Sequence, residues 1–444
     1  MKKLLFVSYY WPPSGGPGVQ RAVKFVKYLP AHGIDPVVVT VDPAHASYPL
    51  TDSSLAHDIP DHVRVVRTKS FEPLRFYRLF SPGKKLPSPG FAGADKPGFM
   101  EKVWRFARGN LLIPDARKGW NSYALKVCTQ LLQEDDYQAV LTTSPPHSTQ
   151  LIGLALQQRF GIPWVADLRD PWTDIYYNRD LYRLRFAWKR DARLEKTVLE
   201  KANAVITVSD SLKELLASKS TRIDRDKIHV IPNGFDHDDF NFLHDGNVSP
   251  RATTKPFVIG YIGTMSDAYP VDGFIKAVMM FLQEHPSADL KIRFTGQLSE
   301  GILETFRNSG LAGKMIFNEH VDHGMAVQQM VASDLLLLII PDVSHNEGIL
   351  TGKLFEYFAS RRPILGFGPL EGDAANMIRQ CQSGKLFGYQ DGEGAGSWIS
   401  FIYKQARAGV NPSAGNEHIE RYSRNEQTAS LAYLIDTIKH AEEI

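Results

Sequence analysis

The sequence predicts an α/β fold of two halves, each a mostly parallel sheet covered by helices on both faces. Three observations support this prediction. Short runs rich in Val, Ile and Leu alternate with helical patterns, and this alternation restarts after one polar stretch. The composition is that of a globular protein, because 43% of the 444 residues are apolar and 23% are charged. Disorder and a coiled coil are therefore poor interpretations.

Seven strands are expected in the first half and five in the second. The first seven are Lys3–Ser8, Asp35–Thr40, Val63–Arg67, Ala139–Thr143, Pro163–Asp167, Ala204–Val208 and Lys227–Ile231. The other five are Phe257–Tyr261, Lys291–Thr295, Asp334–Ile340, Pro363–Gly366 and Gly384–Phe387. The first helix is expected over Val19–Leu29, where apolar residues recur at helical spacing. Ala429–Ala441 is expected to be a closing helix.

The polar stretch His244–Lys255 is typical of a linker, with Gly, Pro, Ser, Thr and both signs of charge. We therefore expect an N-terminal domain over 1–243, a C-terminal domain over 256–420 and the closing helix within 421–444. Both domains are predicted to be Rossmann-like. Because ligands of such sheets bind at the carboxyl ends of strands, the cleft expected between the domains is the candidate site.

Charge and length exclude several classes of protein. Lys plus Arg is 51 and Asp plus Glu is 49, so the net charge of +2 argues against nucleic acid as a partner. The longest apolar stretch, Leu335–Ile340, is far short of the ~20 residues of a membrane span. Met1–Val7 runs into Tyr9–Pro13 without a small-residue cleavage site, so a strand is expected there. With only Cys128 and Cys381, a cytoplasmic location is expected.

The first cluster of candidate residues is the glycine-rich turn that contains Gly15 and Gly16, between the first strand and the first helix. Glycines let a backbone approach a ligand, and a helix N-terminus attracts anions. An ordinary strand-to-helix turn fits these residues equally well. The turn lacks G-x-G-x-x-G, which argues against NAD. Arg21, in the first turn of that helix, points either to the cleft or to solvent.

Two further clusters follow strands of the same half. His147 can donate a hydrogen bond to a sugar hydroxyl or a phosphate, or it is a loop histidine. Asp167-Leu168-Arg169-Asp170 carries an arginine fork and carboxylates that suit a polyol or phosphate. A structural ion pair at the strand end is the alternative for this second group.

The fourth cluster runs from Asn346 to Tyr357 and reads as a glycine-containing loop that leads into a helix near Gly352. Backbone N–H groups at that helix start, together with Lys353, suit a diphosphate. Glu356, one turn later, can accept from the two hydroxyls of a ribose. A solvated helix is the alternative here. The string Asp236-His237-Asp238 follows a turn signal and is interpreted as a solvated connector. No Cys and His residues have the spacing of a zinc site, and no phosphate loop of the G-x-x-x-x-G-K-[ST] type is present.

In their order along the chain, several motifs resemble those of glycosyltransferase family 4, retaining enzymes of the GT-B fold. These are Gly15-Gly16, Ala202-Asn203-Ala204-Val205-Ile206-Thr207-Val208-Ser209, Ile231-Pro232-Asn233-Gly234-Phe235-Asp236, Gly260-Tyr261-Ile262-Gly263, and Lys353-Leu354-Phe355-Glu356-Tyr357 followed by Arg362-Pro363-Ile364-Leu365. The resemblance implies a nucleotide-sugar donor mainly on the C-terminal domain, and a glycan or lipid-linked acceptor on the N-terminal one. It implies no cofactor and no metal.

The resemblance also implies roles for individual residues. The residues expected at the reacting groups are His147, Arg169, Asp170 and Glu347. Those expected to bind the donor are Gly15, Gly16, Gly263, Thr264, Gly348, Ile349, Leu350, Thr351, Gly352, Lys353 and Glu356. Among them, Glu356 matches the second Glu of the family's E-x7-E motif, which holds the donor ribose.

The chain departs from the family pattern at three places. Gly348 stands where the motif has its first Glu, and Glu347 lies one residue early. Thr264 and Tyr269 stand where the family has the Arg and Lys that clamp the diphosphate, so Lys353, Arg21 or Arg169 is expected to supply that charge. Arg169 also stands at about the place of the family's cleft histidine.

The segment Phe71–Trp120 has ten Lys and Arg against four acidic residues, with seven Phe, Tyr and Trp interleaved between its two aromatic end residues. Such a mixture suits contact with the inner face of the cytoplasmic membrane, and a solvated insertion is the alternative. The prediction is a hexosyltransferase of cell-envelope polysaccharide or lipopolysaccharide synthesis. Two alternatives stay open: a nucleotide-sugar epimerase of the same fold, and a non-catalytic scaffold that binds nucleotide sugars.

Overall fold

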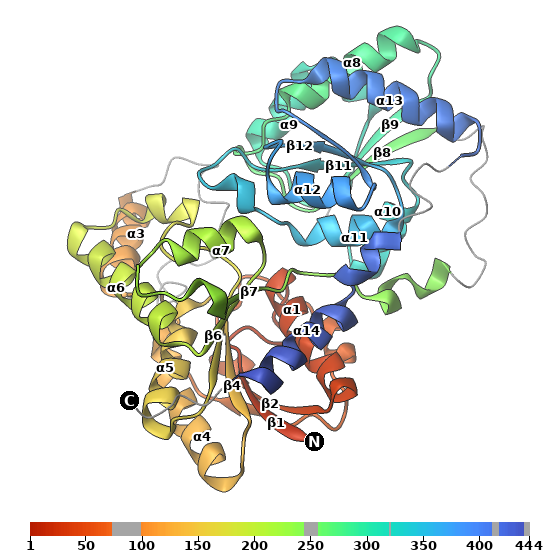
Figure 1. Ribbon diagram of the computed structural model, residues 1–444. Helices are drawn as coiled ribbons and strands as arrows, with labels where there is room; N and C mark the ends of the chain where they lie inside the picture. Colours follow the sequence, from red (N-terminus) through yellow and green to blue (C-terminus); the bar gives the residue numbers. More distant parts are fainter. Residues whose placement is uncertain (73–98, 244–255, 319–320, 411–416, 439–444) are drawn as a thin grey trace. The chain divides into compact units, whose positions relative to one another are not determined.

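The computed structural model describes residues 1–72, 99–243, 256–318, 321–410 and 417–438 (Figure 1). The chain forms two compact units, one of Met1–Asn233 with Arg424–Ile444 and one of Gly234–Ser423. The expected linker over 244–255 lies outside the described residues, and so do residues 73–98 of the basic and aromatic segment.

The first unit is built on a seven-stranded sheet in the order β3-β2-β1-β4-β5-β6-β7, in which all pairs are parallel. Its strands are β1 (Lys2–Val7), β2 (Ile34–Val41), β3 (Val65–Thr68), β4 (Ala139–Ser144), β5 (Trp164–Leu168), β6 (Ala204–Thr207) and β7 (Ile228–Val230). Every expected strand of this half is confirmed, with its ends within two residues of the prediction. The central strands are buried on both faces, which explains their continuous apolar runs.

Helices cover both faces of this sheet. They are α1 (Pro17–Tyr28), α3 (Phe99–Leu111), α4 (Asn121–Glu134), α5 (Gln150–Phe160), α6 (Arg185–Lys201), α7 (Asp210–Ala217) and α14 (Arg424–Thr437). On one face, Val19 and Val23 of α1 share a core with Leu431 and Ile435 of α14, so the C-terminal helix returns to the first unit beside α1 (Figure 1). Apolar side chains of α4, α5, α6 and α7 pack on the other face.

The second unit has a six-stranded parallel sheet in the order β10-β9-β8-β11-β12-β13. Its strands are β8 (Phe257–Ile262), β9 (Leu290–Thr295), β10 (Met315–Asn318), β11 (Leu335–Ile339), β12 (Ile364–Phe367) and β13 (Gly384–Phe387). The five expected strands are found. The edge strand β10 was not predicted, because its apolar run, Met315–Phe317, is only three residues long, and the structure leaves the strand exposed or half-buried.

The helices of the second unit are α8 (Asp272–Glu284), α9 (Glu300–Asn308), α10 (His323–Val331), α11 (Gly352–Ser360), α12 (Asp373–Gln380) and α13 (Gly392–Arg407). Apolar residues of α8, α9 and α13 form the core on one face of the sheet, and those of α10, α11 and α12 form the core on the other (Figure 1). Two parallel sheets covered in this way confirm the predicted α/β fold class.

Candidate functional site

Most of the predicted site residues lie at the carboxyl ends of strands β1, β4, β5, β8 and β11. In each sheet the strand order reverses beside the first strand, because β1 lies between β2 and β4, and β8 lies between β9 and β11. Loops that leave two such strands in opposite directions leave room for a ligand at the carboxyl edge. The turns after β8 and after β1 are therefore the candidate sites of the two units.

Two glycines shape the turn after β8. Gly263 has a φ of 116°, and Gly296, after β9, has a φ of 123°, both in the region that favours glycine. A Cβ on Gly296 would lie only 2.4 Å from the carbonyl oxygen of Gly263. Tyr357 of α11 joins β8 to β11, since its hydroxyl accepts from the Ile262 N–H at 3.1 Å and donates to the Leu337 carbonyl at 3.3 Å. The end of β8 is thereby tied to α11.

The ammonium group of Lys353 lies at this same turn. Its Nζ donates to the Tyr261 hydroxyl at 2.7 Å and lies 4.0 Å from the centroid of that ring. A Cβ built on Gly263 would lie 3.1 Å from Nζ. Burial lowers the pKa of Lys353 from 10.5 to about 7, and the nearby charge of Glu356 opposes that shift. The turn thus holds a half-buried amino group whose charged form a bound anion would stabilise.

The first turn of α11 adds backbone donors beside this cation. The helix begins at Gly352 after an extended Thr351, and no side chain caps its N–H groups. The buried Thr351 Oγ1 has no hydrogen-bond partner among the described residues. Uncapped N–H groups at a helix start carry the positive end of the helix dipole. Together with Lys353 they form a cluster of donors that suits phosphate groups.

Glu356, in the second turn of α11, lies near a histidine that no sequence motif indicated. Its Oε1 lies 3.8 Å from Nδ1 of His323, the first residue of α10. The other ring nitrogen of His323 lies 3.2 Å from Oδ2 of Asp239. No motif links these three residues along the chain, so only the fold reveals them. Glu356, His323 and Asp239 thus form a polar group one turn from Lys353.

The loop before α11 is held by Asn346. The Nδ2 of Asn346 donates to the Pro341 carbonyl at 3.2 Å and to the Tyr389 hydroxyl at 2.9 Å. Glu347 is exposed, and within the described part of the chain its carboxylate has no hydrogen bond or ion pair. The replacement of the family's first Glu by Gly348 therefore leaves Glu347 on the surface of the loop.

The remaining predicted donor residues differ in exposure. Thr264 is exposed, and its carbonyl accepts from the Tyr261 hydroxyl at 2.7 Å. The side chains of Ile349 and Leu350 pack on the apolar core under α11, so only their backbone is available to a ligand. The structure thus brings Gly263, Lys353 and the start of α11 together, with Glu356 one turn away.

In the first unit, Arg169 lies against the start of α1. Gly16, with a φ of 103°, is the residue before this helix, and the neighbouring Gly15 belongs to the same turn. A Cβ on Gly18 would lie 2.3 Å from Nη1 of Arg169, whose Nε donates to the Ser144 carbonyl at 3.0 Å. The guanidinium group therefore lies beside the positive end of a helix. Both charges would be stabilised by an anion.

Arg21 serves a different purpose from the one considered in the sequence analysis. It is fully buried, with Nη2 and Nε at 3.1 and 3.3 Å from the two carboxylate oxygens of Asp167 and Nη1 at 2.8 Å from the Pro232 carbonyl. The Thr143 hydroxyl also donates to Asp167 at 2.8 Å. Neither a cleft-facing nor a solvent-facing Arg21 is correct. The ion-pair alternative holds for Asp167, and Lys353 and Arg169 remain as the cations near the two turns.

His147 and Asp170 lie at the ends of β4 and β5. The His147 ring stacks on Trp172, with centroids 4.9 Å apart, and its buried Nδ1 has no partner among the described residues. Burial, then the charges of Arg169 and Arg183, lower the pKa of His147 to about 3, so the ring is neutral at physiological pH. Burial raises the pKa of Asp170, and Arg169 opposes that shift. A neutral histidine can exchange hydrogen bonds with a hydroxyl but cannot act as a cation.

Among the described residues, no group of three or more His, Cys, Asp or Glu side chains could hold a metal ion. In the same part of the chain, no helix combines the length and the apolar character needed to span a membrane. Cys128 and Cys381 are buried and unpaired.

Comparisons with known proteins agree with this arrangement. Residues 15–234 match the glycosyl transferase 4-like domain. No curated protein sequence matches the chain. Among solved structures, sucrose-phosphate synthase from Thermosynechococcus elongatus superposes with a TM-score of 0.62 at 14% identity, covering 98% of both chains.

Two other solved structures are similar to the same extent. A glycosyltransferase from Rickettsia africae has a TM-score of 0.61 at 14% identity over 99% of both chains. HepE from Anabaena in complex with UDP has a TM-score of 0.60 at 14% identity, over 98% of this chain and 100% of that one. Residues 15–234 therefore match the glycosyl transferase 4-like domain, and the chain as a whole has the GT-B fold of these solved glycosyltransferases.

Proposed function

We propose that the protein is a retaining hexosyltransferase that moves a sugar from a nucleotide-sugar donor to a glycan or lipid-linked acceptor. The observation that carries this proposal is the position of Lys353. Its ammonium lies beside Gly263 at the strand-order reversal after β8, next to the uncapped start of α11. A nucleoside diphosphate has the charge and the oxygens to bind both groups. HepE, of the same fold, is known in complexes with UDP and with UDP-glucose.

In the proposed reaction the sugar–phosphate bond breaks and negative charge grows on the departing diphosphate. Lys353 and the first N–H groups of α11 stabilise that charge, and it is larger in the transition state than in the bound donor. The acceptor hydroxyl attacks from the face that the phosphate leaves, and the phosphate takes its proton. The configuration at the sugar carbon is retained in this way. Glu356, which lies near His323, accepts from the ribose hydroxyls.

We assign the acceptor to the first unit, at the ends of β1, β4 and β5. Neutral His147 exchanges a hydrogen bond with an acceptor hydroxyl there, and Arg169 binds an anionic group at the start of α1. The role in envelope synthesis rests on similar structures, since WaaG and the galactosyltransferase WaaB act in lipopolysaccharide synthesis. The proposal includes action in the cytoplasm, in contact with the inner face of the membrane, and a reaction that needs no metal ion.

A thermal-shift screen against UDP, GDP, dTDP, CMP and their sugars tests the donor site. A true ligand at 100 times its Kd adds about 2.7 kcal/mol to the free energy of unfolding. Lys353→Met should abolish the shift, while the matched control Lys385→Met, an exposed lysine of the same unit, should keep it. An identical shift in Lys353→Met and the parent protein would contradict the proposed site.

Product analysis then separates the alternative functions. Transfer with retention gives a product whose new linkage has the donor's anomeric configuration by NMR, and EDTA should not slow it. Turnover of the donor without any acceptor would instead identify an epimerase. Binding of a nucleotide without transfer or slow donor hydrolysis would identify a scaffold.

A further inference from the structure

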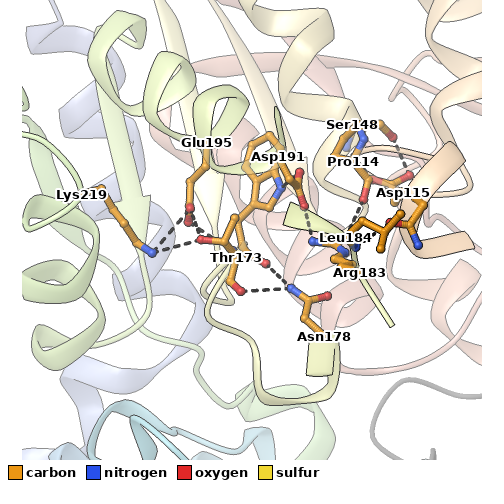
Figure 2. A network of polar contacts seen from close by, with 12 residues as sticks. Pro114, Asp115, Ser148, Thr173, Asn178, Arg183, Leu184, Asp191, Glu195 and Lys219 are labelled. Carbon is orange, nitrogen blue, oxygen red and sulfur yellow. Dashed lines mark hydrogen bonds and ion pairs between the residues drawn. The ribbon is translucent and has the colours of Figure 1, made fainter. Parts of the chain in front are cut away.

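Helix α6 buries two of its carboxylates and exposes both of its aromatic residues. Ala187, Asp191 and Glu195 recur every four residues and are buried. Asp191 accepts from Trp172 Nε1 at 2.8 Å and pairs with Arg183 Nη1 at 2.5 Å. Figure 2 shows these two acids pointing into a polar network under the helix. An ordinary surface helix buries mainly apolar residues, whereas α6 buries these two carboxylates together with Val198 and Leu199.

The second buried acid, Glu195, is held in the same network. It accepts from the Thr173 hydroxyl, and Lys219 Nζ lies 3.6 Å from its Oε2 (Figure 2). Burial raises the pKa of Glu195 to about 7. Two buried carboxylates with their own partners fix which side of α6 faces inward. The outward face is therefore a defined feature of the fold.

That outward face combines large apolar side chains with cations. Phe186 is 56% exposed and Trp188 is 52% exposed, and Arg185, Lys189 and Arg190 around them are exposed as well. The run from Leu181 to Arg190 has no acidic residue. Of the seven tryptophans, Trp188 alone is exposed by more than a third. No ion pair with an acid is formed by Arg185, Lys189 or Arg190 in the part of the chain that the structure describes.

Helix α3 extends this surface. The end of α3 is fixed to the start of α6, because Asn110 donates to the Tyr182 carbonyl at 3.1 Å and accepts from the Leu184 N–H at 2.7 Å. The two helices lie side by side in Figure 1. The exposed apolar residues that they share are Val103, Phe106, Leu111, Tyr182, Leu184, Phe186 and Trp188. We call this set, with Lys102, Arg185, Lys189 and Arg190, the α3–α6 surface.

We propose that the α3–α6 surface docks on a bilayer of anionic phospholipids. Tryptophan and tyrosine prefer the level of the lipid headgroups, where an apolar ring and a polar edge are both solvated. Lys and Arg beside them are attracted by the negative potential of an anionic leaflet. Aromatic residues and cations together, with no acid between Leu181 and Arg190, match both properties of that one partner. The inference rests on the membrane contact in the proposed function and adds the surface that makes it.

Co-sedimentation of the whole protein with vesicles tests the docking. Vesicles of phosphatidylglycerol and phosphatidylethanolamine are compared with vesicles of phosphatidylcholine, at low and at high salt. The parent protein should bind the anionic vesicles alone, and salt should weaken binding because it screens the charges. A triple variant, Arg185→Glu, Lys189→Glu and Arg190→Glu, should lower the partition coefficient by about tenfold or more. A second variant, Phe186→Ser with Trp188→Ser, should also lower it.

Matched controls change the same charge and the same kind of apolar area elsewhere. The charge control replaces the exposed Arg64, Lys126 and Lys385 by Glu, and the apolar control replaces the exposed Phe401 and Tyr433 by Ser. Both controls should bind vesicles like the parent protein. Equal loss in the charge control and the triple variant would show a net-charge effect and overturn the proposal.

Trp188 provides a readout of insertion. Lipids brominated on their acyl chains should quench its emission, and Trp188→Phe should remove that quenching. Absence of quenching, or vesicle binding that both α6 variants keep, would overturn the proposal. Self-association that both α6 variants abolish, without any vesicle binding by the parent, would assign the surface to a second copy of the chain instead. UDP binding is measured alongside, so loss of docking with normal UDP binding is distinguished from failure of the donor site.

Discussion

The lowered pKa of Lys353 predicts how donor binding depends on pH. In the free protein the pKa is about 7, because burial beside Tyr261 and Gly263 disfavours the charged form. A bound diphosphate favours the ammonium form and raises this pKa again. Above pH 7, binding therefore requires a proton that the free site has lost, and affinity falls as pH rises.

The magnitude follows from the fraction of Lys353 that is protonated. For a group with a pKa of about 7, the protonated fraction falls about 80-fold between pH 7.5 and 9.5. This fall corresponds to about 2.6 kcal/mol of binding free energy. A terminal phosphate titrates near pH 6, so the charge of the diphosphate is constant over this range. The Kd for UDP should thus rise by about 80-fold over these two pH units.

Isothermal titration calorimetry with UDP measures the effect, with three proteins compared. In Lys353→Arg the guanidinium stays charged throughout, so its Kd should be independent of pH. In Lys353→Met the Kd should be high and also independent of pH. A parent protein whose Kd is as flat as that of Lys353→Arg would refute the assignment of Lys353 to the diphosphate.

The lowered pKa of Lys353 also predicts how the stability of the nucleotide-free protein depends on pH. The unfolded chain binds the Lys353 proton up to pH 10.5 and the folded chain only up to about 7, so the unfolded state holds more protons between these values. The free energy of unfolding of the parent should therefore rise from pH 7.5 to 9.5 relative to Lys353→Met. The same proton thus strengthens UDP binding and weakens the free fold.

Three further predictions concern buried or oriented groups. Glu356→Ala should weaken UDP binding by about 10- to 100-fold, because the ribose loses a hydrogen bond to a charged acceptor. In calorimetry, UDP that lacks both ribose hydroxyls should bind the variant and the parent equally. Arg21→Met should lower the free energy of unfolding, measured in urea, by about 3–5 kcal/mol, because Asp167 is left buried and unpaired. Adding Asp167→Leu should restore part of that stability. A loss below ~1 kcal/mol in Arg21→Met would contradict a structural role for the ion pair. Folding lowers the pKa of His147 from 6.5 to about 3. As the pH falls below 6.5, the unfolded chain therefore binds a proton at His147 before the folded chain does, and the free energy of unfolding of the parent should fall. At pH 4.5, His147→Gln should have lost about 2.7 kcal/mol less than the parent, and parallel losses would argue against a buried neutral ring.

The fold could be predicted because its signal is local and repeated. Each central strand is buried on both faces, so a run such as Leu335–Ile339 must be apolar throughout, and the helices between strands carry an apolar stripe. The strand β10 is neither buried on both faces nor apolar throughout. It lies at the edge of its sheet with Ile316 and Phe317 exposed, and its pairing with β9 is a tertiary fact. Local patterns cannot predict such a strand.

The site could be predicted only in part, because side-chain partners are set by distant elements. The sequence indicated the loop and helix around Lys353 and Glu356, since glycines and charges follow a buried strand there. It gave no sign that His323 of α10 lies at Glu356, or that Arg21 is paired with Asp167. Arg21 stands in the first turn of its helix, but it is buried at its partner Asp167 in β5. The place of Arg21 in the sequence therefore could not show whether its side chain is buried or exposed.

The lost diphosphate clamp shows why motif positions and charge positions need not agree. The family's cations stand just after the first strand of the second domain, where this chain has Thr264 and Tyr269, and Tyr269 packs on the apolar core. A bound phosphate would, however, interact with charge at a point in space, whatever the place of the charged residue in the chain. Lys353 reaches the turn at Gly263 from the neighbouring helix, so a cation is kept there while its origin in the chain differs. A Gly263→Ala substitution would meet both a positive φ and the Lys353 ammonium at 3.1 Å, which explains why glycine suits this position.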